Sequence, residues 1–297
     1  MNTSEALMVA DKLTRLARHI GISGGEPLVR DDIMDIMAYI AERAESMSMQ
    51  SNLILMDYTK AKALADMGLR TLYTSLDGPS PIYHEALRGE GTWRALMRGI
   101  RIIKKAGLKF STVTTINSLN WKVVDKTAKL SETLGASAAC FIPIVPIGRA
   151  RGKGLMPTPR QMREAVEKLR SIASELSIPI VLWCAPFAIG LGDREIYVSP
   201  CTDKGLDVDP MGRVLLCDTM DIQISDMRKT VDEITWDLKH NEHLILAANR
   251  RPDPCSSCPY YEFCKGGCVA RSYLVYGKFD APDPLCPIAS GVTEEKS

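Results

Sequence analysis

The spacing of the cysteines constrains this chain more than any other feature of its sequence. Seven of its nine cysteines lie after residue 200, and four of these form the pattern Cys-x2-Cys-x5-Cys-x3-Cys. Proline residues and the pair Gly266 and Gly267 accompany that pattern, so the chain is expected to turn sharply there. Soft thiolate ligands at such a spacing suit iron-sulfur clusters or zinc. The seven residues are Cys201, Cys217, Cys255, Cys258, Cys264, Cys268 and Cys286.

A predicted hairpin brings two of these cysteines together. Cys201 and Cys217 bracket residues 207–216, and the sequence Asp-Pro-Met-Gly at 209–212 is typical of a turn. The ends of a hairpin lie close to each other, so this pair is able to share one metal site. Seven cysteines are too many for one four-ligand site and one short of two. Cys184, another side chain or an open iron would complete the second site.

Disulfides, free buried thiols and zinc are the alternatives to iron-sulfur clusters. The N-terminal segment carries Asp and Glu instead of a signal-peptide pattern, so we expect a cytoplasmic protein whose thiols stay reduced. Zinc sites usually pair two Cys-x2-Cys segments, and this sequence has one. The cytoplasmic setting therefore favours metal over disulfides, and the spacing favours iron over zinc.

The composition limits the size of the fold and the kind of partner. With 297 residues and 45% apolar content, the chain has room for one large domain and a smaller one. The cysteine distribution predicts a boundary that separates residues 1–183 from residues 184–297. The 37 Lys and Arg nearly cancel the 36 Asp and Glu, which argues against nucleic acid or an anionic membrane surface as partner. A peptide or a small molecule is the expected substrate.

Residues 1–183 alternate strand and helix patterns, which predicts an α/β fold with a parallel sheet. The five expected strands are residues 20–23, 53–56, 71–76, 110–116 and 138–145. The helices that follow them are residues 31–44, 59–67, 93–106, 121–134 and 159–176. A barrel and an open doubly wound sheet both fit this pattern. The chain opens with a helix at 4–18 and no strand before it, so the first strand is expected at an edge and a segment is expected in front of Met1.

Two segments at the ends of predicted strands are candidates for ligand binding. Gly24, Gly25, Glu26 and Pro27 follow the first strand, at the position where parallel α/β folds bind ligands. The glycines would let the backbone approach a ligand, and the carboxylate would suit an ammonium group. A plain turn with an early-helix proline explains the same residues without a ligand.

The second segment, residues 74–79, ends the third strand and precedes His84 and Arg88. A turn with a capped helix is its simplest interpretation. Asp77 and His84 are expected to order this loop.

Together these patterns resemble the radical S-adenosylmethionine (SAM) enzymes that carry a C-terminal SPASM domain. The family pattern runs Cys, nine to fifteen residues, Gly, four residues, Cys, a gap, Cys-x2-Cys-x5-Cys-x3-Cys, a gap and a last Cys. Here ten residues separate Cys201 from Gly212, four separate Gly212 from Cys217, and the match continues through Cys286. The resemblance covers almost the whole chain and implies a partial parallel (β/α) barrel followed by a small cysteine-rich domain.

The same resemblance assigns roles to individual residues. The segment from Gly24 to Pro27 matches a GGEP motif that binds the amino group of SAM, and Ser75 and Arg88 match residues near its ribose and carboxylate. The ligands implied for an outer auxiliary 4Fe-4S cluster are Cys255, Cys258, Cys264 and Cys286. Those implied for an inner cluster are Cys201, Cys217 and Cys268, with Cys184 as the expected fourth ligand.

Asp218, directly after Cys217, matches the catalytic base of the related sulfatase-maturing enzymes. Hydrogen bonding to the hairpin backbone is an equally simple explanation for this aspartate. Thr115 and Asn117, which end the fourth strand, could line the same end of the sheet as the two ligand-binding segments. The basic residues at 149–153, Arg149, Arg151 and Lys153, fit a solvated loop better than a site, although a role in binding a substrate carboxylate stays open.

The sequence contains no Cys-x3-Cys-x2-Cys motif, which in this family holds the cluster that cleaves SAM. We expect an N-terminally truncated form of a normal enzyme, inactive as it stands; a natural variant without radical chemistry is the alternative. The complete form is expected to use a 5'-deoxyadenosyl radical on a peptide or protein substrate, with ferredoxin or flavodoxin as electron donor. Tetrapyrrole synthesis and a non-catalytic iron-sulfur module are the other hypotheses.

Overall fold

The computed structural model of the chain describes residues 1–192, 195–199 and 205–292. Its described residues fall into two compact units. Unit 1 comprises Met1–Ser75, Ser80–Thr112 and Leu206–His240, and unit 2 comprises Leu76–Pro79, Val113–Gly205 and Asn241–Ser297. Each unit is made of several separate segments of the chain, so this division does not test the boundary predicted between residues 183 and 184. That boundary stays a prediction.

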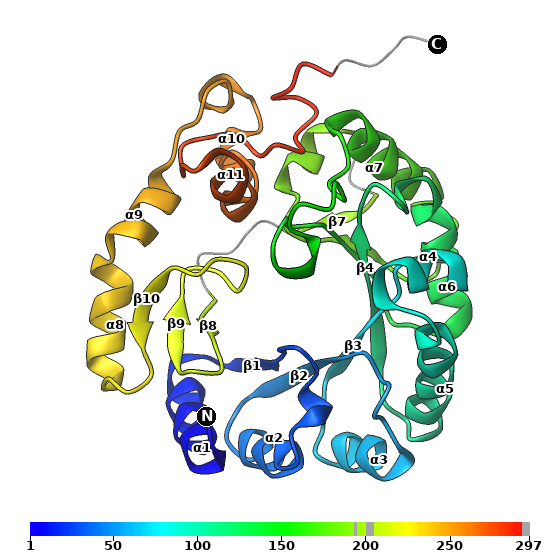
Figure 1. Ribbon diagram of the computed structural model, residues 1–297, viewed down its shortest axis with the longest axis vertical. Helices are drawn as coiled ribbons and strands as arrows, with labels where there is room; N and C mark the ends of the chain where they lie inside the picture. The colour runs from blue at the N-terminus through cyan, green and yellow to red at the C-terminus, as the bar shows by residue number, and fades with distance from the viewer. Residues whose placement is uncertain (193–194, 200–204, 293–297) are drawn as a thin grey trace. The chain divides into compact units, whose positions relative to one another are not determined.

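Unit 1 is built from strand-helix repeats (Figure 1). Its strands β1, β2 and β3 pair in parallel, with His19 opposite Ser46 and Ser48 opposite Thr71. Helix α5 turns an apolar stripe inward, with Leu96 and Ile100 buried. The elements are α1 (Thr3–Leu16), β1 (His19–Ile22), η1 (Pro27–Val29), α2 (Ile33–Ala41), β2 (Ser46–Ser51), α3 (Tyr58–Asp66), β3 (Thr71–Ser75), α4 (Pro81–Arg88) and α5 (Thr92–Lys105).

The strand predicted at residues 53–56 is wrong. The second strand is β2, which has the sequence Ser-Met-Ser-Met-Gln-Ser and buries four of its six residues. Short polar side chains and methionines do not form the β-branched run that signals a strand, so the apolar run at 53–56 was the stronger pattern. In the structure Leu53 takes a positive φ of 62° and is fully buried, whereas Ile54 and Leu55 are exposed.

Leu53 packs against Gly99 in the middle of α5. A Cβ atom added at Gly99 would lie 2.5 Å from the Cβ of Leu53 and 3.0 Å from its carbonyl oxygen. Glycine is therefore needed here for close approach, although an alanine inside a helix is ordinarily favourable by roughly 0.5–1 kcal/mol.

We expect Gly99→Ala to destabilise the protein by about 1–3 kcal/mol, because the added methyl group overpacks the contact with Leu53. Chemical denaturation would measure the free energy of unfolding. In a Leu53→Gly background, which removes the clashing Cβ and leaves only the contact with the carbonyl oxygen, the same substitution should cost less. Equal costs in both backgrounds would contradict the packing explanation.

The second part of unit 1 is an antiparallel three-stranded sheet and a helix. It consists of β8 (Asp207–Val208), β9 (Arg213–Leu215), β10 (Gln223–Asp226) and α8 (Val231–His240). The hairpin turn predicted at 209–212 is confirmed: the amide of Gly212 donates to the carbonyl of Asp209 over 2.9 Å, and Gly212 has a φ of 83°. The strand β10 was not expected from the sequence.

Unit 2 continues the strand-helix pattern and then enters the cysteine-rich segment. Its first elements are η2 (Trp121–Val123), α6 (Val124–Leu134), β5 (Ala139–Pro143), η3 (Gly148–Ala150), α7 (Pro159–Ala173), β6 (Ile180–Leu182), η4 (Pro186–Gly190) and β7 (Tyr197–Val198). The later elements are α9 (Glu242–Asn249), η5 (Cys255–Ser257), α10 (Tyr261–Cys264) and α11 (Val269–Tyr276). Strand β4 (Phe110–Ile116) crosses the division between the units.

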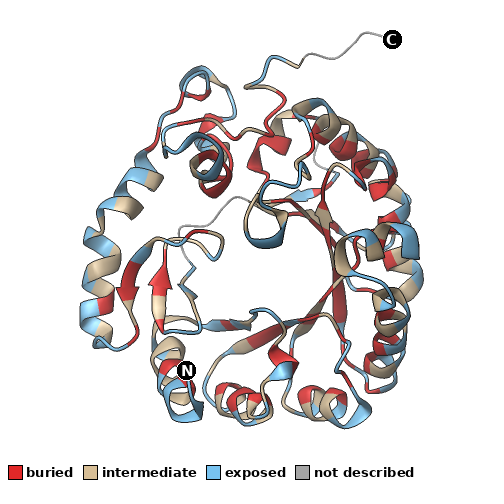
Figure 2. Ribbon diagram, in the orientation of Figure 1, coloured by how far each residue is buried: buried red, intermediate tan, exposed pale blue. Residues whose placement is uncertain are grey.

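One apolar core runs through unit 2. Strands β4, β5 and β6 and helices α6 and α7 contribute side chains to it. Leu285 and Cys286, near the other end of the chain, belong to the same core. Figure 2 shows the buried residues concentrated along the strands and on the inner faces of these helices. The cysteine-rich segment is thus packed on the same core as the strands.

The described strands β1 to β7 form one sheet in chain order, and the pairs β1–β2, β2–β3, β5–β6 and β6–β7 are parallel. Strand β1 stands first in this order, as predicted for an edge strand. Strands β6 and β7 extend the five predicted strands. Within the described part of the chain, no helix is long and apolar enough to cross a bilayer.

Candidate functional site

The loop after β1 is fixed by the carboxylate of Glu26. Its Oε1 accepts hydrogen bonds from the hydroxyl of Ser51, over 2.8 Å, and from the amide of Leu28, over 3.1 Å. Its Oε2 accepts one from the amide of Asn52, over 2.7 Å. Glu26 therefore caps η1 and ties this loop to the carboxyl end of β2. Most of its acceptor capacity is used inside the protein.

Glu26 thus holds its loop in place, and the neighbouring glycines present backbone. Gly24 has a φ of 138°, which only glycine adopts readily, and a Cβ on Gly24 or Gly25 would meet no described atom within 4 Å. Pro27 is buried at the start of η1. Ser75 ends β3 and Arg88 ends α4, both partly exposed. The structure places each of these predicted SAM-facing residues in unit 1.

In unit 2, Asp77 connects the segment after β3 to the end of β4. This fully buried carboxylate accepts a hydrogen bond from the amide of Thr115 over 2.8 Å. The amide of Asn120 donates to the carbonyl oxygens of Asp77 and Thr115, and that of Asn117 also donates to Thr115. Asp77 orders its loop, as predicted. Asn117 and Asn120, both buried, serve the turn after β4.

The four cysteines expected to hold the outer cluster lie in unit 2, on η5, at the end of α10 and just before the C-terminus. Burial, with a smaller contribution from the nearby Cys286, raises the pKa of the Cys264 thiol to about 12. Burial likewise raises the pKa of Cys286 to about 11, with Cys255 contributing. Cys258 acts on Cys255 in the same way. The four thiols therefore lie close enough to influence one another, as the predicted ligand set requires.

None of the eight cysteines that the structure describes is part of a disulfide. Buried thiols with raised pKa values carry protons that iron displaces on binding, so metal affinity is linked to deprotonation. The four cysteines of the outer set do not form a group whose ligand atoms lie within 4.8 Å of one another. A tetrahedral zinc site needs such closeness, whereas a four-iron cluster spaces its ligands more widely. The donor set fits the cluster.

A buried ion pair stabilises the cysteine-rich segment. The guanidinium of Arg271 on α11 binds the carboxylate of Asp283 through Nη2, over 2.6 Å, and through Nε, over 3.1 Å, and both side chains are fully buried. Asp283 also accepts hydrogen bonds from the amides of Cys268 and Leu285 over 2.8 and 3.0 Å. Burial alone would lower the pKa of Arg271, but the facing carboxylate more than offsets this.

The turn between Cys264 and Cys268 passes through three consecutive residues of positive φ, Lys265, Gly266 and Gly267. A Cβ on Gly267 would lie 2.3 Å from the Cβ of Asp283. Glycine therefore suits the left-handed backbone at both positions, and at Gly267 it also allows close contact with the carboxylate.

A second buried arginine, Arg250, wraps this turn from the other side. Its Nε donates to the carbonyl of Lys265 over 2.9 Å, and its Nη2 donates to the carbonyl of Gly266. Its Nη1 donates to the hydroxyl of Ser272, over 3.3 Å, and to the carbonyl of Phe279, over 3.2 Å. These contacts lock the backbone between Cys264 and Cys268.

Two of the cysteines expected to hold the inner cluster lie near the same arginine, Arg271. The charges of Cys268 and Cys184 both contribute to the upward shift of the pKa of Arg271, after the larger contribution of Asp283. Nη2 of Arg271 also donates to the carbonyl of Cys184, which has a positive φ of 52°. Such a conformation in a non-glycine residue is uncommon. Cys201 lies outside the described residues.

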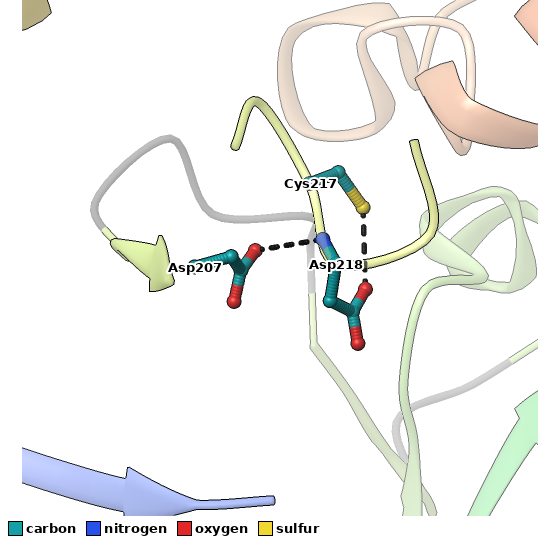
Figure 3. A group of neighbouring side chains, drawn as sticks. All are labelled: Asp207, Cys217 and Asp218. Atoms are coloured by element: carbon teal, nitrogen blue, oxygen red, sulfur yellow. Dashed lines mark hydrogen bonds between the residues drawn. The ribbon is translucent and has the colours of Figure 1, made fainter. Parts of the chain in front are cut away.

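Figure 3 shows Cys217, Asp218 and Asp207 at the end of the hairpin in unit 1. The Sγ of Cys217 lies 3.4 Å from a carboxylate oxygen of Asp218 and 3.2 Å from the hydroxyl of Thr219. The amide of Asp218 donates to the carboxylate of Asp207 over 3.1 Å. Loss of solvation and the nearby charge of Asp218 raise the pKa of Asp207. The carboxylate of Asp218 therefore lies beside the thiol, as a base next to a cluster ligand would.

Sequence reasoning missed Arg250, Arg271 and Asp283. Ion pairs between residues 12 positions apart, on a helix and in a loop, have no sequence period that could reveal them. The available signals were an arginine three residues after Cys268 and an aspartate three residues before Cys286.

Comparison with known proteins gives the same picture. Residues 1–131 match the profile described as "Radical SAM superfamily". The "AdoMet-dependent heme synthase" of Nitratidesulfovibrio vulgaris is 26% identical over 306 residues, which cover 96% of this chain and 83% of that protein. The "PqqA peptide cyclase" of Methylocella silvestris is 24% identical over 282 residues, 91% of this chain and 74% of that protein.

Solved structures show the same fold. "Native anSMEcpe with bound AdoMet" has a TM-score of 0.74 at 17% identity, and the likeness covers 98% of this chain and 86% of the other. The predicted fold class, a partial parallel (β/α) barrel with a cysteine-rich C-terminal segment, is confirmed. Residues 1–131 thus match the radical SAM superfamily, and the similar enzymes cover 91–96% of the chain.

Proposed function

We propose that this protein is a radical SAM maturase or oxidoreductase that modifies a peptide or protein substrate. Its match to the superfamily profile and the enzymes to which it is similar make it an enzyme. The observation that carries the proposal is the similarity to a peptide cyclase over 91% of the chain, beside a buried set of cysteines suited to an auxiliary cluster. The number of cysteines and the reducing compartment that they need support a cytoplasmic location.

The SAM-facing residues would bind and orient the cofactor. When bound to a 4Fe-4S cluster and reduced, SAM supplies a 5'-deoxyadenosyl radical, which takes a hydrogen atom from the substrate. Gly24 and Gly25 would offer backbone groups to its amino end, and Glu26 would hold them in place through Ser51 and Asn52. Ser75 and Arg88 would contact the ribose and the carboxylate. The chain has no Cys-x3-Cys-x2-Cys segment, so its own cysteines do not fit the SAM cluster.

The auxiliary clusters would bind substrate or accept an electron, and the overall electron source would be a ferredoxin or flavodoxin. Cys255, Cys258, Cys264 and Cys286 would hold the outer cluster. Cys201, Cys217, Cys268 and Cys184 would hold the inner one, and the electrostatic effect that Cys184 and Cys268 both have on Arg271 supports Cys184 as a partner of Cys268. Asp218 would take a proton from the oxidised substrate beside Cys217.

A carboxylated tetrapyrrole is the second candidate substrate. It is favoured by the similarity to a heme synthase over 96% of the chain, and by Arg149, Arg151 and Lys153 after β5, which could pair with carboxylates. Anaerobic assays with candidate precursor peptides from neighbouring genes and with iron-free and iron-loaded porphyrin carboxylates would separate the two classes.

Release of 5'-deoxyadenosine tests the enzyme activity. Protein made from the complete open reading frame, reconstituted anaerobically and given dithionite and SAM, is expected to release 5'-deoxyadenosine. Glu26→Gln is expected to weaken SAM binding about tenfold, because an amide replaces one of two carboxylate oxygens that accept hydrogen bonds from Ser51, Leu28 and Asn52. Absence of product from the unaltered protein would favour a non-catalytic iron-sulfur module.

Iron content tests the cluster assignment separately. Two auxiliary clusters correspond to about eight irons per chain. Cys264→Ser is expected to lower the iron content by about four. Cys140→Ser is the matched control, since Cys140 is buried in β5 and lies outside the predicted ligand sets. Stoichiometric zinc with negligible iron would contradict the assignment.

A further inference from the structure

The charges buried in the cysteine-rich segment do not balance. Arg250 and Arg271 are both buried there, with 4% and 0% of their surfaces exposed, whereas Asp283 is the one buried carboxylate among the described residues of this segment. Asp283 pairs with Arg271 through two hydrogen bonds. One guanidinium charge is therefore left without an ionic partner in the described part of the chain.

Arg250 carries that charge. All its hydrogen bonds end on neutral oxygens, three peptide carbonyls and the hydroxyl of Ser272. Among the described residues, no carboxylate lies within ion-pair distance of Arg250. A buried cation held only by neutral groups is costly unless an anion lies nearby.

The contacts of Arg250 place it against the cysteine ligands. Two of its carbonyl partners, on Lys265 and Gly266, belong to the turn that joins Cys264 to Cys268. Ser272, a third partner, donates in turn to the carbonyl of Cys268 over 3.0 Å. Asp283, which is already paired with Arg271, acts electrostatically on Arg250, and so do Cys268, Cys255 and Cys264.

We propose that Arg250 is the charge partner of the outer auxiliary cluster and raises its reduction potential. The inference rests on the proposed function, because it takes Cys255, Cys258, Cys264 and Cys286 as cluster ligands. A four-iron cluster with four thiolate ligands is a net anion and gains one more negative charge when it accepts an electron. A buried cation beside it stabilises the reduced form more than the oxidised form. Arg250 thereby suits the cluster to accept an electron from the substrate.

The test is a redox titration of the reconstituted holoprotein, followed by the electron paramagnetic resonance signal of the reduced auxiliary clusters. Arg250→Gln removes the charge, and Ser272→Asp neutralises it by placing a carboxylate at a position 3.3 Å from Nη1. In both variants we expect the ratio of reduced to oxidised outer cluster at a fixed solution potential to fall at least tenfold, which is 59 mV for a one-electron couple. Arg250→Lys keeps the charge and should shift the ratio much less.

Arg251→Gln is the matched control, because Arg251 is the next residue but is exposed, so solvent screens its charge. Iron content is measured for every variant. An unchanged potential in an iron-loaded Arg250→Gln or Ser272→Asp protein would overturn the proposal. Loss of the cluster in both neutralised variants but not in Arg250→Lys would support it, whereas loss in all three would show a packing role and overturn it. Absence of any four-iron signal in the unaltered protein would instead refute the cluster assignment.

Discussion

Replacing Asp283 by alanine is expected to destabilise the protein by about 3–5 kcal/mol, since it leaves the buried guanidinium of Arg271 without its counter-charge. The same change leaves the buried amides of Cys268 and Leu285 without their acceptor. Chemical denaturation under anaerobic conditions would measure the loss. Because Cys268 follows the turn that Asp283 holds, the iron content of the reconstituted protein should fall as well.

Glu175→Ala provides the comparison. Glu175 pairs with Lys129 over 2.7 Å, but more than half of its side chain is exposed, so the expected loss is within about 1 kcal/mol. Similar losses for Asp283→Ala and Glu175→Ala would show that the buried pair has no special role.

Gly267→Ala is expected to cost about 3 kcal/mol or more. The new Cβ would lie 2.3 Å from the Cβ of Asp283 and 2.8 Å from its Oδ2, so the carboxylate would have to move away from Arg271. The positive φ of 85° adds roughly 1–2 kcal/mol of backbone strain. The free energy of unfolding and the iron content would both report the change.

Gly277→Ala separates the clash from the strain. Gly277 ends α11 with a φ of 72°, and a Cβ there would meet no described atom within 4 Å. Only the strain of about 1–2 kcal/mol should appear. If Gly277→Ala cost as much as Gly267→Ala, contact with Asp283 would not be the reason that position 267 needs glycine.

The sequence predicted those elements whose signals are local. The hairpin turn at 209–212 was found because Asp209, Pro210 and Gly212 favour that conformation by themselves. Strand β2 was missed because its burial depends on the neighbouring strands and helices, whereas its Ser and Met residues have no marked preference for a strand. Leu53, the first of the apolar residues at 53–56, instead packs in a tight bend against α5.

The candidate site divides in the same way. Cysteine spacing predicted the outer ligands, and in the structure these thiols lie close enough to influence one another's pKa values. Arg250, Arg271 and Asp283 could not be found, because a buried charge in a sequence looks the same as an exposed one. Only the three-dimensional structure shows that Glu26 is bound to Ser51 and Asn52, which lie on a different strand-helix repeat.

The core that joins α6 and α7 to Leu285 and Cys286 determines whether the cysteine-rich segment from Cys184 onward could be moved into another protein. A fragment cut before Cys184 would lose the helices against which its last cysteine packs, and we would not expect it to fold alone. Chimeras between relatives should therefore fold when they are joined in the surface loops of unit 2. Chimeras joined between residues 183 and 184, where the cysteine-rich composition begins, should not fold. The last part of the cysteine-rich segment is therefore not expected to be a detachable module, because Cys286 shares the hydrophobic interior of the strands that precede it.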